Sequence, residues 1–94
     1  MKTDNPAHPG QIIVETLENM NISLREFAKA MDIAPSTARR LLSGQTAVTP
    51  EMALRLSVVI GRTPEAWMKM QADYSLNKAK EKVDIHHLHR LSCF

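Results

Sequence analysis

The sequence predicts an all-α fold, with one domain of five helices and a short C-terminal extension. Its 94 residues, of which 44% are hydrophobic, suit one compact domain and leave little chain for a second. Aromatic residues make up only 4% of the chain, so the core has to be built from Leu, Ile, Val, Met and Ala, which favour or tolerate helices. Apolar residues also recur three and four positions apart between capping residues, prolines and glycines, as in amphipathic helices.

Two helices are predicted in the first third of the chain. Residues 1–8 are polar and contain a proline, which predicts a flexible lead-in before the domain. A first helix is predicted over residues 10–21, because apolar side chains recur on one face of it. Ser23 followed by Glu26 is a capping-box pattern, and the helix behind it is predicted to run to about Met31.

Three further helices are predicted where a proline stands at the first turn. Proline suits this position because its missing N–H has no partner there in any case. The predicted spans are 35–43, then 50–60 with Thr49 as the cap, and 64–80 or beyond with Thr63 as the cap.

The predicted domain therefore covers residues 9–80, and residues 81–94 form a tail. Val83 and Ile85 alternate with polar neighbours in this tail. The alternation predicts either a short strand or an extended arm, which is a candidate for dimerisation.

Charge and cysteine content restrict the compartment and the partners. Twelve basic and ten acidic residues give a net charge of +2, so an anion-binding surface has to come from local clustering. The single cysteine, Cys93, has no intrachain disulfide partner, and the N-terminus lacks the pattern of a secretory signal. The apolar runs are far shorter than the roughly 20 residues that cross a bilayer. We therefore expect a cytoplasmic protein without a membrane span.

The third predicted helix has two chemically different faces. At about 100° per residue, one sector is apolar and is expected to face the core. Its members are Ala34, Ala38, Leu41 and Leu42. On the opposite side lie Ser36, Arg40 and Ser43, with Thr37 and Arg39 on the two flanks. Arginine can bind guanine O6 and N7 bidentately, and small hydroxyl side chains let the backbone approach bases and phosphates, so this face suits DNA.

The second and third helices and the short break between them have the lengths of a helix-turn-helix. Around this motif the chain resembles the Xre-type helix-turn-helix proteins, and within them the HigA-like antitoxins of bacterial toxin–antitoxin operons. The resemblance covers residues 8–76 and is carried by "HPGQIIVETLENMNIS", "LREFAKAMDIAPSTARRLLSGQTAVTPEMALRLSVVIG" and "TPEAWMKMQADYSL". The spacing W-x3-Q-x2-Y-x-L in the last segment separates this subgroup from other Xre domains. A lambda-repressor-like fold is implied.

Two positions depart from the family pattern. Asp32 stands where the turn often has glycine, and Asp adopts the left-handed conformation at modest cost, so the turn remains intact. Gln45 stands where a lysine often follows Gly44, which removes one phosphate contact and affects affinity more than the fold.

The resemblance also implies roles for individual residues in binding double-stranded operator DNA. Ser36, Thr37 and Arg40 are implied to read bases. Phosphates are implied to be held by Arg39, Gln45 and Thr46. Arg25 and Lys29 are weaker candidates for phosphate contacts, because exposed charges on a helix are common. For Thr37 the alternative is a hydrogen bond to its own helix backbone.

The remaining unusual residues are explained better by packing than by chemistry. Trp67 could anchor a partner, but it shares a helix face with Met70 and Tyr74 and is predicted to lie in the core. Core or core-edge positions are also predicted for four methionines, namely Met20, Met31, Met52 and Met70.

The tail offers only weak candidates for a metal site or a nucleophile. His86, His87 and His89 lack the Cys or carboxylate partners of a tight metal site. Cys93 lacks the fixed geometry that nucleophilic catalysis requires. The sequence therefore predicts no enzyme activity, no metal and no cofactor.

Two classes of function stay open at this point. The first is an operator-binding repressor that acts as a homodimer through the last helix and the tail, and that neutralises a cognate mRNA-cleaving toxin, as the resemblance implies. The second is a protein-interaction module, or a stand-alone Xre-type regulator without a toxin partner.

Overall fold

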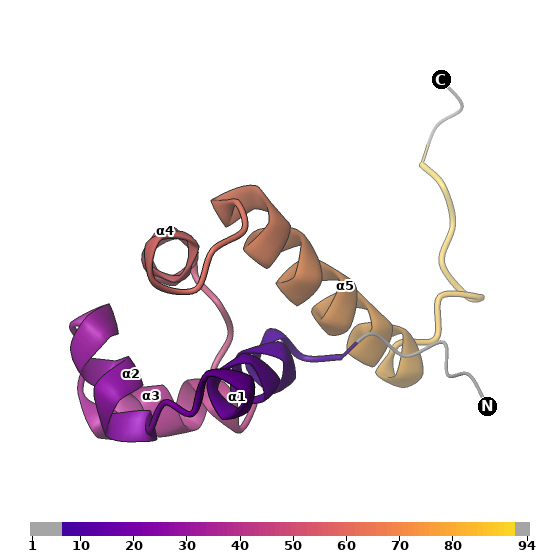
Figure 1. The fold of residues 1–94 in the computed structure, drawn as a ribbon. Coiled ribbons are helices and arrows are strands. Elements are labelled where there is room, and N and C mark those ends of the chain that lie inside the picture. The colour runs from indigo at the N-terminus through magenta and orange to yellow at the C-terminus, as the bar shows by residue number, and fades with distance from the viewer. Residues whose placement is uncertain (1–6, 92–94) are drawn as a thin grey trace.

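The computed structural model describes residues 7–91 and is all-α, as predicted, with no strand in that range. Its helices are α1 (Pro9–Met20), α2 (Leu24–Met31), α3 (Pro35–Leu42), α4 (Pro50–Val59) and α5 (Pro64–Lys82). Figure 1 shows α1, α2 and α3 grouped at one end, with α4 beside them and the long α5 leading away to the tail. None of these helices is both long and apolar enough to cross a membrane.

The helix starts follow the predicted capping residues. The Ser23 hydroxyl accepts a hydrogen bond from the Glu26 N–H at 3.1 Å, and the Glu26 carboxylate accepts one from the Ser23 N–H at 2.9 Å. Thr49 and Thr63 cap α4 and α5 through the same kind of side-chain contact. Asp32 has a φ of 59°, which confirms the left-handed turn that follows α2.

The helix ends differ from the prediction by one or two residues. Helix α3 ends at Leu42, with Ser43 as its C-cap, and α4 ends at Val59. Helix α5 ends at Lys82, in agreement with the prediction of an end at residue 80 or beyond, and Lys80 and Lys82 in its last turn interact favourably with the helix dipole. Residues 83–91 contain a turn rather than a strand, so the extended arm is the alternative that the structure supports.

Trp67 occupies the centre of the core, as predicted. Its side chain is fully buried, and its indole N–H donates a hydrogen bond of 2.8 Å to the Gly61 carbonyl. Ten other apolar residues complete the core. They are Ile13, Leu17, Phe27, Ala28, Met31, Ala38, Leu41, Val48, Ala53 and Leu56.

Two predicted core positions are wrong, and the position of each residue explains why. Met20 is 55% exposed, because it is the last residue of α1 and no other helix covers it. Ala34 is exposed, because it is the N-cap of α3 and lies outside the helical sector from which its burial was predicted. Met31 is buried as predicted, and Met52 and Met70 pack at the edge of the core.

His8 corrects the predicted lead-in. It is only 7% exposed and forms the N-cap of α1, so the folded domain includes it. A histidine is an uncommon N-cap residue, which is why the sequence pattern pointed to Pro9 instead. Residues 1–6 lie outside the described part of the chain.

Candidate nucleic-acid interface

The turn between α2 and α3 is fixed by a residue from α4. The Arg55 guanidinium donates hydrogen bonds to the Met31 and Asp32 carbonyls at 2.7 and 3.1 Å. It also pairs with the exposed Glu51 carboxylate at 2.9 Å. Carbonyls at a helix C-terminus lack partners within the helix, so a cation that binds them stabilises both the helix end and the turn. The sequence analysis did not identify this role of Arg55.

Helix α3 presents the polar face that its periodicity predicted. Ser36, Arg39 and Arg40 are exposed and Thr37 is half-buried, whereas Ala38 and Leu41 are buried. Within residues 7–91, neither arginine forms an ion pair, and the Thr37 side chain forms no hydrogen bond to the helix backbone. The guanidinium groups and hydroxyls of this face are therefore available to an external partner.

The loop after α3 stays close to the end of that helix. Gly44, with a φ of 83°, supplies the left-handed residue that reverses the chain. The N–H groups of Gln45 and Thr46 then donate to the Arg40 carbonyl at 2.9 and 3.4 Å. These bonds hold Gln45 and Thr46, the two predicted phosphate ligands of the loop, beside the C-terminal turn of α3.

A buried glutamine of α5 fixes the same loop from the other side. The Gln71 side chain accepts a hydrogen bond of 2.8 Å from the Val48 N–H and donates one of 3.0 Å to the Ser75 hydroxyl. Gln71 is the glutamine of the W-x3-Q-x2-Y-x-L spacing, so this part of the motif serves to attach the loop to α5.

The start of α1 packs against the end of α3 and the loop that follows it. A Cβ atom added to Gly10 would lie 2.5 Å from the Leu41 carbonyl oxygen and 2.7 Å from that of Leu42, so α1 and the end of α3 are in direct backbone contact. The His8 Nδ1 accepts a hydrogen bond of 2.9 Å from the Gly10 N–H. Burial lowers the pKa of His8, and a hydrogen bond with the Thr46 backbone acts in the opposite direction.

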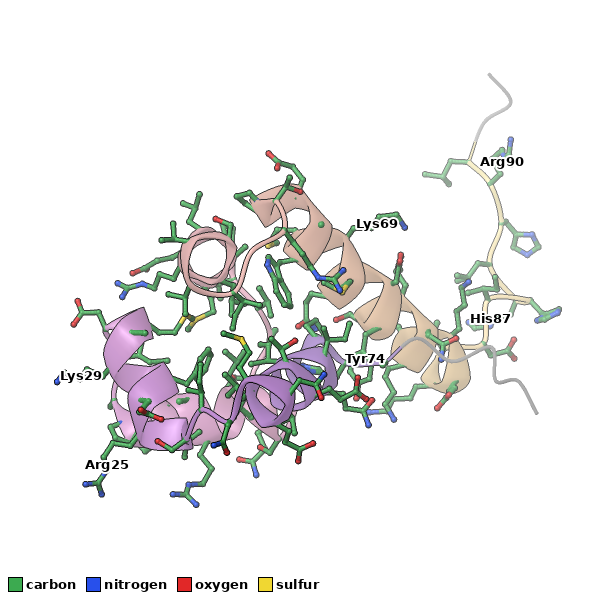
Figure 2. The ribbon with its side chains drawn as sticks, in the orientation of Figure 1. Arg25, Lys29, Lys69, Tyr74, His87 and Arg90 are labelled. Atoms are coloured by element: carbon green, nitrogen blue, oxygen red, sulfur yellow. The ribbon has the colours of Figure 1, made fainter. Side chains whose placement is uncertain are left out.

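Arg25 and Lys29 extend the positive surface onto α2. Figure 2 shows both side chains pointing away from the core at the α2 edge of the molecule. Residues 24–42 carry four cations and two carboxylates, a balance of +2 that equals the net charge of the whole chain. The local clustering that anion binding requires is therefore present on α2 and α3.

The histidines of the tail are not gathered into a metal site. Among residues 7–91, no three potential ligands from His, Cys, Asp and Glu form a group. The exposed His86 ring lies 3.2 Å from the Asp84 carboxylate. Cys93 lies outside the described residues.

Comparison with known proteins gives the family of this chain. A family model described as helix-turn-helix matches residues 13–68. The chain belongs to this helix-turn-helix family. It is 56% identical over 91 residues, and 97% of either chain, to YddM of Escherichia coli K12, an uncharacterized regulator of the same type.

Two solved antitoxins share the fold of this helix-turn-helix protein. Antitoxin GraA in complex with its operator is 31% identical over 99% of this chain and 98% of its own, with a TM-score of 0.84. Pseudomonas aeruginosa antitoxin HigA, solved with the higBA promoter, is 28% identical over 94% of this chain and 100% of its own, with a TM-score of 0.81. The predicted resemblance to HigA-like antitoxins is confirmed.

Proposed function

We propose that this protein is a homodimeric, sequence-specific DNA-binding antitoxin that represses its own operon and neutralises a cognate mRNA-cleaving toxin in the cytoplasm. The observation that most supports DNA binding is the exposed face of arginines and hydroxyls on α3. No carboxylate within residues 7–91 forms an ion pair with these arginines. The same fold is found in GraA and HigA, which were solved with operator and promoter DNA.

The dimensions of α3 suit a major groove. An α-helix with its side chains is about 10 to 12 Å in diameter, which matches the groove width of about 12 Å, and the eight residues of α3 form about two turns that can lie in the groove. In this geometry Ser36, Thr37 and Arg40 contact base edges. Arg39, Gln45 and Thr46 contact one phosphate strand, and Arg25 and Lys29 approach the flanking phosphates.

One short recognition helix covers only a few base pairs, which favours a homodimer on a two-fold operator with half-sites roughly 34 Å apart. Apolar side chains on α5 and the tail are exposed in a single chain and are the proposed dimer contacts. They are Leu76, Val83, Ile85, Leu88 and Leu91.

Selection of binding sites from a random duplex library tests the DNA-binding proposal. We expect the wild-type protein to enrich one two-fold sequence with half-sites about one helical turn apart. The matched control is the double variant with Arg39→Ala and Arg40→Ala, which should keep the helical circular dichroism spectrum but enrich no sequence. Enrichment of no sequence by the folded wild type would instead favour a protein-interaction module.

Co-expression tests the antitoxin part of the proposal separately. The product of the adjacent open reading frame should arrest growth alone, and this protein should restore growth and co-purify with it. If the protein selects an operator but does not restore growth, the result favours a stand-alone regulator without a toxin partner.

A further inference from the structure

His8 lies where three parts of the fold meet. It is the N-cap of α1, and its ring packs edge-on against the Tyr74 ring of α5, with centroids 4.9 Å apart and an interplanar angle of 86°. Its ring also faces Gly44, since a Cβ added there would lie 3.6 Å from the His8 Cγ. Figure 2 shows Tyr74 where α5 passes the start of α1. One side chain therefore contacts α1, α5 and the loop that follows the recognition helix.

The hydrogen bonds of His8 require a neutral ring with one specific tautomer. Nδ1 accepts from the Gly10 N–H at 2.9 Å, so it carries no proton. Since a neutral ring carries one proton, that proton is on Nε2. The ring also lies against Gly44 of the loop, and the Thr46 backbone partly offsets the effect of burial on the pKa of His8. His8 thus connects the N-terminus of α1 to the loop that carries Gln45 and Thr46.

Within residues 7–91, no carboxylate lines the small cavity beside His8. The lining of that cavity includes Gln11 of α1, Ser43 and Gly44 of the loop, and Tyr74 of α5. Behind Tyr74, the Lys78 ammonium lies 5.9 Å from the centre of its ring and is itself positive. Protonation would also turn Nδ1 into a donor that faces the Gly10 N–H, at the positive end of the α1 dipole.

We propose that His8 is a positioning residue for operator binding, whose neutral ring holds the loop of Gln45 and Thr46 in place, so that acidification releases this loop and weakens binding. The proposal rests on the proposed function. The lowered pKa that burial gives His8 supports it, because the folded domain then disfavours the imidazolium form. Acidification therefore destabilises the folded domain at the point where the loop contacts His8.

The pH dependence of operator affinity tests this proposal, with His8→Asn as the matched variant. Asn caps α1 well but does not titrate, and it is too short to reach from Gly10 to the loop at Gly44. The selected duplex is titrated from about pH 7.5 to about pH 5, a range that extends well below the ordinary imidazole pKa because that of His8 is lowered. Over this range the wild-type affinity should fall by about fivefold relative to the variant, the equilibrium effect of one hydrogen bond.

The comparison with the variant also separates the effect of His8 from that of the other histidines. His86, His87 and His89 are present in both proteins, so their contribution to DNA binding cancels in the ratio of the two affinities. Equal pH profiles of the wild type and the variant would overturn the proposal. A wild-type affinity that rises on acidification more than that of the variant would also overturn it, because His8 would then act as a direct phosphate ligand.

A second measurement follows the attachment of the loop in the free protein, without DNA. In nuclear magnetic resonance spectra of the free protein, the amide signals of Gly10 and Gln45 should titrate together, with an apparent pKa below the ordinary imidazole value. The His8→Asn variant should show neither titration. If the protein bound no selected duplex but these amides titrated as expected, the loop attachment would stand and the proposed function would fail. If the Gln45 amide did not titrate in the wild type, the proposal would be wrong.

Discussion

Replacing the two adjacent arginines of α3 separately is expected to impair DNA binding in different ways. Arg40 lies on the outer ridge of the helix with Ser36, whereas Arg39 is turned towards one flank. We therefore expect Arg40 to read a base and Arg39 to hold a phosphate. Arg40→Ala should weaken operator binding by about 1 to 3 kcal/mol, or about five- to 150-fold. It should also reduce the difference in affinity between the operator and random DNA.

Arg39→Ala should weaken binding to operator and random DNA alike. A phosphate contact releases one counterion without reading a base, so the slope of log affinity against log salt should become shallower by about 0.9. The two variants are good controls for each other. Both arginines are exposed, in the last turn of α3 and outside every ion pair within residues 7–91, so each replacement should cost only a few tenths of a kcal/mol of stability.

The assay is a titration of both variants against the selected operator and a scrambled duplex at several salt concentrations. Circular dichroism and thermal melts verify that both variants are folded. Equal losses on the two duplexes for Arg40→Ala, or a loss confined to the operator for Arg39→Ala, would refute these roles.

Four further predictions concern the stability of the folded domain that positions the interface. Arg55→Met should lower the free energy of unfolding by about 2 to 3 kcal/mol in urea titrations, because charge-assisted hydrogen bonds to two carbonyls are lost, whereas Glu51→Ala should cost less than about 0.5 kcal/mol as an exposed ion pair. Gly10→Ala should cost about 1 to 3 kcal/mol in the same titration, since its Cβ would overlap backbone oxygens of α3. Trp67→Phe should cost about 2 to 3 kcal/mol through a cavity and an unpaired carbonyl, and an unchanged thermal midpoint would contradict its central place in the core. The lowered pKa of His8 means that the unfolded chain binds its proton more readily, so stability should fall as pH drops below about 6.5, and His8→Asn should flatten this part of the profile.

The helices and the outer face of α3 were predictable because their signals are local. A cap such as Ser23 and its partner Glu26 stand three residues apart, and the Pro35 that opens α3 acts on its own turn. The polar face likewise follows from helical periodicity within eight residues. The sequence therefore contained the chemistry of the candidate site in one short segment.

The contacts that position this segment join distant parts of the chain. Arg55 binds the Asp32 carbonyl across 23 residues, and Gln71 binds the Val48 N–H across the same separation. His8 reaches Tyr74 and the loop after α3 from the other end of the domain. No periodicity or capping rule relates such positions, so these roles required the folded structure.

These distant contacts matter because α3 has little stability of its own. It has eight residues, no side-chain hydrogen bond at its N-cap, and only two fully buried side chains, whereas isolated helices need roughly 12 to 15 residues to be even marginally stable in water. Its position is therefore set by the burial of Ala38 and Leu41, by the backbone contact at Gly10, and by Arg55 at the turn. Bidentate base recognition tolerates displacements of only about 0.5 Å. We therefore expect residues outside the proposed contact surface, Gly10 and Arg55 among them, to control how accurately Arg40 meets a base.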